Sequence, residues 1–119
     1  MKLSAEILAA AQNFGQILGE TSPVEEYKKA EQIVKNDLEA SGLENRLEIL
    51  YSHLASQEQT GEALGRGELD EYYLLRSKVV ENFLISARED QKQMVKMLFA
   101  EVNQTMTSIL GIDFTILVL

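Results

Sequence analysis

Apolar residues recur every three or four positions along most of the chain, and this spacing predicts α-helices. The strongest stripe lies between Asn82 and Gly111, and its apolar members fall on one helical face. We take as candidate protein-interface residues Val95, Leu98, Phe99, Val102, Met106 and Ile109. A stripe this rich must be covered by the rest of the chain or by a partner, with Leu98, Phe99, Val102 and Met106 at its centre.

Capping residues predict where the first two helices begin. Ser4 is expected to cap a first helix that ends near Gly19. Ser22 and Glu25 have the spacing of a capping box, in which the Ser22 side chain accepts from the Glu25 N–H. A second helix is therefore expected from Ser22, with a stop or kink at Ser41–Gly42.

Glycines predict the turn that follows the third helix. Leu43 to Leu54 carry the third apolar seam, and the glycines after it predict a flexible hairpin turn, at Gly61, Gly65 and Gly67. No clear stop follows before Gly111, so a single helix of about 40 residues is expected. Any bend in it is expected at the polar run from Arg88 to Gln93.

These elements predict an all-α fold, an antiparallel helical hairpin or bundle with a long C-terminal helix, in an oligomer. Its 119 residues fit one domain, which we place at 1–111. Residues 112–119 form a short apolar tail. We expect the tail to pack on its own domain or on a partner, with a recognition peptide as the alternative.

Composition narrows the classes of function. The chain has 19 acidic and 11 basic residues, a net charge of −8, which disfavours direct binding to nucleic acid or to anionic membranes. It has no cysteine, which fits a cytoplasmic protein. It also lacks an apolar run long enough to span a membrane, and Glu6 interrupts any signal-like segment at the N-terminus.

Candidate chemistry is sparse, so we predict no catalytic, cofactor-binding or metal-binding residues and no enzyme activity. His53 is the only histidine, and nothing in the sequence marks a nucleophile for it. Leu50 stands three residues before it, so the Glu-x-x-His motif of two-metal bundles is not formed. Two alternatives stay open: a carboxylate-based metal-binding bundle and an RNA-binding accessory protein.

Short motifs, in a fixed order, run through most of the chain. They are Glu25–Glu31 (EEYKKAE), Gln59–Gly61 (QTG), Asn82–Ile85 (NFLI), Leu98–Asn103 (LFAEVN) and Ile109–Gly111 (ILG). In their order and spacing they resemble the YlbF/YmcA family of small bacterial helical regulatory proteins, with its YheA-like relatives. The resemblance covers roughly Leu8 to Gly111.

The resemblance implies a non-enzymatic regulatory adaptor that forms homodimers or larger assemblies. Implied partners are other family members or a ribonuclease complex, and implied processes are RNA processing, competence, sporulation and biofilm formation. Some relatives hold iron–sulfur clusters through cysteines, which this chain lacks, so no cofactor is expected.

The chain departs from the family pattern between Asn82 and Gln93. Phe83 stands where the family has proline, which favours a continuous helix here. Arg88 and Gln91 stand where the family has an apolar residue and alanine. If this protein has a private specificity, a choice of partner that its relatives do not share, we therefore expect this segment to determine it.

Overall fold

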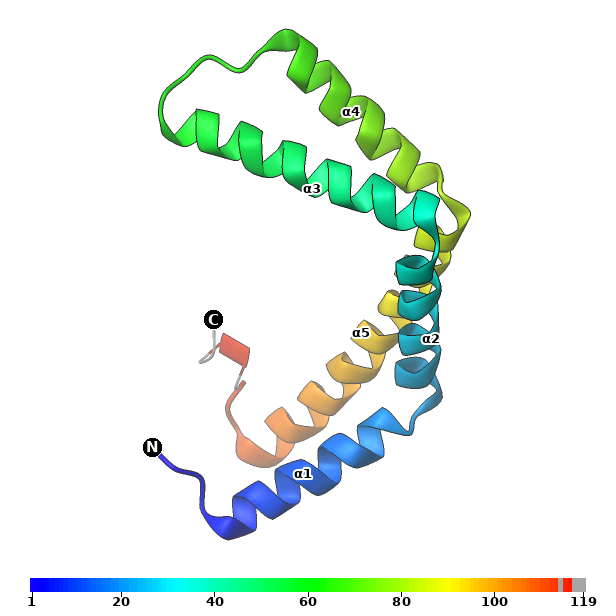
Figure 1. Cartoon of the computed structure of the whole chain (residues 1–119). Coiled ribbons are helices and arrows are strands. Elements are labelled where there is room, and N and C mark those ends of the chain that lie inside the picture. The colour runs from blue at the N-terminus through cyan, green and yellow to red at the C-terminus, as the bar shows by residue number, and fades with distance from the viewer. Residues whose placement is uncertain (114, 117–119) are drawn as a thin grey trace. The chain divides into compact units, whose positions relative to one another are not determined.

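The computed structural model describes residues 1–113 and 115–116, and these are organised as helices without strands. In chain order the helices of the described residues are α1 (Ala5–Gly19), α2 (Ser22–Asn36), α3 (Leu38–Gln59), α4 (Arg66–Glu81) and α5 (Phe83–Leu110) (Figure 1). The all-α class is therefore confirmed. The predicted tail lies in part outside the described residues, at Phe114 and 117–119.

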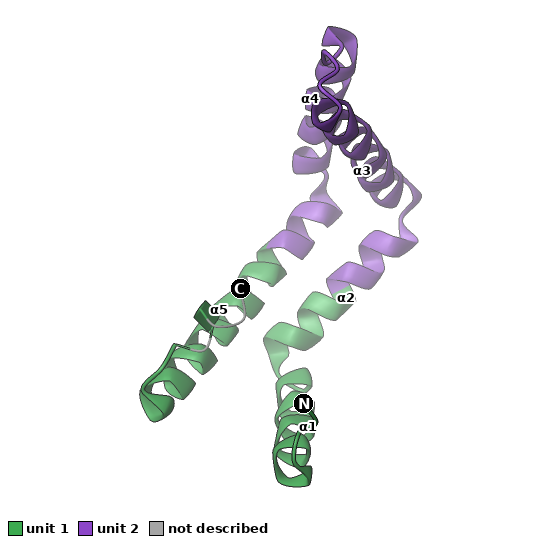
Figure 2. Ribbon diagram, turned by 90° about the vertical axis from the view of Figure 1, so that its left-hand side faces the viewer, with its two compact units in different colours: residues 1–29, 90–119 green, residues 30–89 purple. Residues whose placement is uncertain are grey.

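The chain divides into two compact units (Figure 2). Unit 1 consists of residues 1–29 and 90–119, which include α1, the start of α2 and most of α5. Unit 2 consists of residues 30–89, which include the end of α2, α3, α4 and the first turns of α5. The single domain expected at 1–111 stays a prediction.

The core lies in unit 2, where α3 and α4 pack side by side as an antiparallel hairpin (Figure 1). Partly buried Val79 and Leu84 pack against a cluster formed by Val34, Ala40 and Ile85. All the buried residues among those described belong to this unit: Val34, Ala40, Leu43, Leu54, Leu75 and Ile85. Burial of these side chains from α2, α3, α4 and α5 is what holds unit 2 together.

Several predicted helix ends are confirmed. The Ile7 N–H donates to Ser4 Oγ at 3.2 Å, so Ser4 caps α1. Gly61 and Gly111 adopt φ angles of +77° and +73° just after α3 and α5, a conformation that glycine tolerates best. The turn between α3 and α4 is thus where the glycines predicted it, although Gly67 already lies in the first turn of α4.

The expected capping box at the start of α2 is not formed. The Glu25 N–H donates to the carbonyl oxygen of Thr21 at 3.0 Å, because Ser22 is already the first residue of the helix. The Thr21 hydroxyl in turn donates to the Leu18 carbonyl oxygen at 2.6 Å. The chain therefore passes from α1 to α2 through one tight turn.

The predicted stop at Ser41–Gly42 is wrong. The second helix ends earlier, at Asn36, and Asp37 caps α3 by accepting from the Ala40 N–H at 2.8 Å. Gly42 lies inside α3. An aspartate that satisfies a first-turn N–H outweighs the modest penalty of a glycine within a helix.

The continuous helix expected from Gly67 to Gly111 is also wrong. The fourth helix ends at Glu81, and Asn82 is extended, with φ −67° and ψ 122°. Its Oδ1 accepts from the Ile85 N–H at 3.0 Å and so caps α5. The long C-terminal helix is present with 28 residues, starts at Phe83 and runs without interruption through Arg88–Gln93.

Candidate functional site

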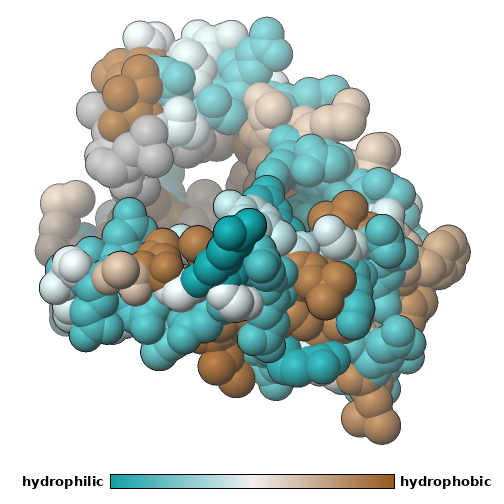
Figure 3. All heavy atoms as spheres, turned by 90° about the horizontal axis from the view of Figure 1, so that it is seen from above, coloured by the Kyte–Doolittle hydropathy of each residue, from teal (hydrophilic) through white to brown (hydrophobic). Residues whose placement is uncertain are grey.

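Unit 1 exposes apolar side chains on both of its main helices. None of its described residues is buried. On α1, Ile7 is 56% exposed and Ile17 is 53% exposed, and on α5 Ile109 is 80% exposed. In the space-filling view of the whole chain from above, hydrophobic residues also lie at the surface among hydrophilic ones (Figure 3). Among the described residues, these two helices therefore form no buried core of their own, and they leave a continuous apolar surface exposed.

An apolar groove of about 760 Å³ lies between α1 and the C-terminal half of α5. Asn103 and Thr115 are the polar residues among its described lining. The full lining consists of Ile7, Ala10, Ala11, Phe14, Leu18, Phe99, Val102, Asn103, Met106 and Thr115. Its volume falls in the range of binding pockets, and its open, apolar surface suits a helix face better than a polar ligand.

The structure brings together three of the six candidate interface residues. Phe99, Val102 and Met106 line the groove. Val95 and Leu98 are half-buried on the same helix outside the groove lining, and Ile109 is exposed near its end.

The opposite wall of the groove was not among the site residues predicted from the sequence. That wall comes from α1, through Ile7, Ala10, Ala11, Phe14 and Leu18. Their helical spacing was visible in the sequence, but spacing alone does not show which two stripes share a groove.

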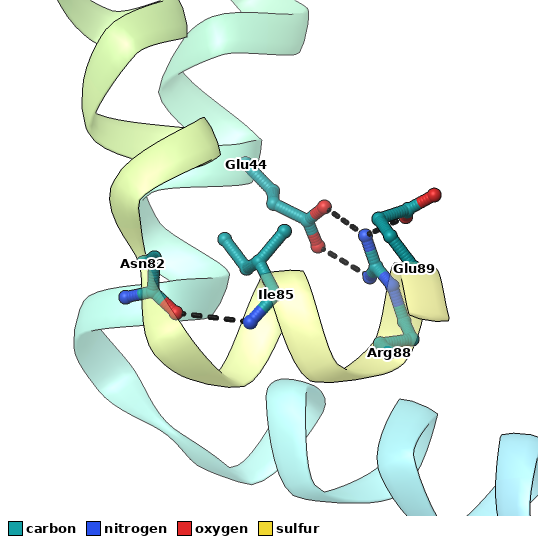
Figure 4. A network of polar contacts seen from close by, with 5 residues as sticks. All are labelled: Glu44, Asn82, Ile85, Arg88 and Glu89. Atoms are coloured by element: carbon teal, nitrogen blue, oxygen red, sulfur yellow. Dashed lines mark hydrogen bonds and ion pairs between the residues drawn. The ribbon is translucent and has the colours of Figure 1, made fainter. Parts of the chain in front are cut away.

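Arg88 is the centre of a polar network in unit 2 (Figure 4). Its Nη1 and Nη2 donate to Glu44 Oε1 and Oε2 at 2.8 Å and 2.5 Å, and Nη2 also donates to Glu89 Oε1 at 3.0 Å. The Arg88 side chain is only 16% exposed. The hydrogen bonds that Arg88 donates to Glu44 are the main reason that the pKa of Arg88 is raised, against the opposing effect of burial.

This bidentate pair connects α3 to the first turns of α5 and so has a structural role in unit 2. A private specificity in the Asn82–Gln93 segment stays a prediction. The segment also contributes Ile85, whose side chain is 3% exposed in the core of unit 2.

His53 lies exposed on α3, and its Nε2 is 3.4 Å from Glu68 Oε2 on α4. Within 1–113 and 115–116, no three His, Asp or Glu residues are placed so that they could hold a metal ion. Over the same residues, no helix has both the length and the apolar character needed to cross a membrane.

A family model and a solved structure match the chain. Residues 7–110 match a family model described as "Control of competence regulator ComK, YlbF/YmcA". A solved protein of unknown function (DUF964) from Bacillus stearothermophilus is similar in structure, with a TM-score of 0.65 and 19% sequence identity. That similarity covers 89% of this chain and 93% of the other, and at this identity it shows the fold alone. No curated protein matches the chain.

Proposed function

The chain belongs to the YlbF/YmcA family, whose description names control of the competence regulator ComK, and we propose that it is a non-enzymatic regulatory adaptor. It acts by helix-mediated association through the groove of unit 1. One observation carries the proposal. Unit 1 has a large apolar groove, and none of its described residues is buried.

A second copy of the chain is the first partner that fits this surface. Two copies related by a twofold axis would each supply α1 and the C-terminal half of α5, which gives four helices around one shared apolar core. Phe99, Val102 and Met106 would then be buried by the partner's helices. Another member of the family, with a similar apolar face, would form the same contact.

The finer roles are part of the same proposal. As an adaptor in the cytoplasm, the chain would supply a binding surface to a regulatory complex that acts in competence, sporulation, biofilm formation or RNA processing. A ribonuclease complex is one such assembly. The net charge of −8 makes protein surfaces, rather than RNA itself, the preferred binding partners.

The oligomeric mass in solution tests this proposal. We expect light scattering to give the wild-type protein a mass of at least two chains, each of 13.4 kDa. Phe99→Ser and Val102→Asp should lower it to the monomer mass, because they place a polar or charged group on the covered face. Phe99 is 48% exposed within a single chain, so the Phe99→Ser substitution removes no buried core side chain. A loss of assembly in this variant would therefore not result from unfolding of a core.

Gln104→Asp is the matched control, since Gln104 is exposed on the same helix and outside the groove. It should leave the mass unchanged. A monomeric wild type, or an unchanged mass in both groove variants, would contradict association through this face. Tagged wild-type and Phe99→Ser proteins purified from native cells would then show whether other family members are bound through the groove.

A further inference from the structure

A smaller groove of about 370 Å³ lies between α3 and α4, within unit 2. It is lined by Glu44, Leu47, Glu48, Tyr51, Tyr72 and Val79. The lining combines two aromatic rings, two aliphatic side chains and two carboxylates. None of the described lining residues is a lysine or an arginine.

Tyrosines from both helices meet in this groove. The ring centroids of Tyr51 on α3 and Tyr72 on α4 are 6.2 Å apart, with the ring planes tilted by 35°. Tyr73 adds an edge contact to Tyr72, with centroids 5.5 Å apart. Tyr51 is 59% exposed and Tyr72 is half-buried, so the two rings contact each other and Tyr51 stays accessible to solvent. Exposed tyrosines held in this way are typical anchors of protein interfaces.

The charge around the groove is strongly negative. Twelve acidic and six basic residues fall within 30–89, so unit 2 carries −6 of the chain's net charge of −8. The Glu44 carboxylate is already held by Arg88. Glu48 is exposed, and its carboxylate forms no hydrogen bond or ion pair with another described residue. The groove therefore offers aromatic rings beside one free carboxylate.

We propose that this groove binds an arginine side chain from a basic segment of a partner protein. The guanidinium group stacks against the rings of Tyr51 and Tyr72, and the Glu48 carboxylate accepts its hydrogen bonds. The aliphatic part of the arginine side chain packs on Leu47 and Val79. Arginine fits better than lysine because a planar guanidinium can stack on an aromatic ring and donate to a carboxylate at the same time.

This surface is independent of the groove in unit 1. Unit 1 would assemble copies of the chain, and the α3–α4 groove would recruit a basic partner to the assembly. The oligomeric mass of the Phe99 and Val102 variants tests the first surface alone. Either proposal can therefore fail without the other.

Binding of short synthetic peptides to the full chain tests the arginine site. The probes are three peptides of one design that carry arginine, lysine or glutamine at the same positions. Calorimetry gives the affinities, and tyrosine fluorescence reports on the site because the chain has four tyrosines and no tryptophan. We expect the arginine peptide to bind more tightly than the lysine peptide and the glutamine peptide not to bind.

Two variants should weaken binding of the arginine peptide without changing the fold of the protein. Tyr51→Leu and Glu48→Gln should each lower the affinity about two- to fivefold, the range for one cation–π contact or one exposed ion pair. Glu58→Gln is the matched control, because Glu58 is exposed on the same helix outside the groove. It should leave the affinity within the error of the wild type. Helical content and oligomeric mass should be unchanged in all three variants.

Three results would overturn the proposal. Equal losses of peptide affinity in Glu48→Gln and Glu58→Gln would mean that the peptide is attracted to the acidic surface in general. Equal affinities for arginine and lysine peptides, with no effect of Tyr51→Leu, would mean that the rings are not used. A lower oligomeric mass in Tyr51→Leu would mean that the groove is a contact between copies.

Discussion

Asn82 sets the point at which α4 ends and α5 begins. Its backbone is extended, and its N–H donates to the carbonyl oxygens of Lys78 and Val79 while its side chain accepts from Ile85. One residue thus satisfies polar groups at the end of one helix and the start of the next. No proline is needed for the break, and Phe83 can begin α5 directly after it.

Replacing Asn82 tests this capping role. Asn82→Ala should lower the free energy of unfolding by about 1 kcal/mol, because the Ile85 N–H loses its acceptor. Asn82→Asp keeps an acceptor oxygen at the same position and should retain most of the stability. Urea denaturation followed by circular dichroism measures both. Equal stability of the alanine and aspartate variants would show that the cap contributes nothing.

Gly61 in the α3–α4 turn and Gly67 in the first turn of α4 should respond oppositely to replacement by alanine. Gly61 has a φ of +77°, so Gly61→Ala should destabilise the protein by about 1 kcal/mol. Gly67 lies in α4, and a Cβ added there meets no atom within 4 Å. Gly67→Ala should therefore stabilise the protein by about 0.5 kcal/mol, since it reduces the freedom of the unfolded chain. Thermal unfolding of both variants checks the two signs, and a shift of the same sign in both would contradict the assignment.

The ion pair of Arg88 with Glu44 acts at the scale of whole helices, since it connects α3 to the first turns of α5. The two residues are 44 positions apart, so no local pattern in the sequence indicated the contact. The pair adds directional hydrogen bonds beside the apolar contacts of Ile85.

A double-mutant cycle measures what this connection contributes. Arg88→Met should destabilise the protein, because it leaves the partly buried Glu44 carboxylate without its donor. With Glu44→Gln as the second change, we expect a coupling energy of about 1 to 2 kcal/mol from urea denaturation. Single effects that add within about 0.5 kcal/mol would show that the pair contributes little.

The helices themselves were predictable from the sequence, but their junctions were predictable only in part. Ser4 and Gly111 were recognised because each stands where an apolar stripe begins or ends. Asp37 and Asn82 were missed because the apolar spacing continues across them. A break of a single residue hardly shifts the helical phase, so periodicity alone does not reveal it.

The candidate site was predictable to a similar extent. Phe99, Val102 and Met106 were identified from one stripe on α5, but the matching wall from Ile7 to Leu18 on α1 was not assigned to them. Tyr51 and Tyr72 belong to different helices, and only the pairing of α3 with α4 brings them into one groove. Contacts between distant segments depend on tertiary packing, which a single sequence does not display.

At the scale of the whole molecule, the two units differ in how much apolar surface they bury. Unit 2 contains all the buried residues among those described, while unit 1 exposes apolar side chains on α1 and α5. Burial is the main favourable contribution to folding, so unit 2 should be stable within a single chain. The stability of unit 1 should instead depend on its association with a second copy.

Hydrogen exchange at different protein concentrations tests this difference. Dilution favours the free chain, so the amides of α1 and of residues 95–110 should exchange faster as the concentration falls. The amides of Val34, Leu75 and Ile85 should exchange at constant rates, because their burial lies within unit 2. In Phe99→Ser the unit 1 amides should exchange fast at every concentration, whereas Gln104→Asp should behave like the wild type. Exchange in unit 1 that is independent of concentration in the wild type would mean that this unit is stable without a partner, and its apolar groove would then need another explanation.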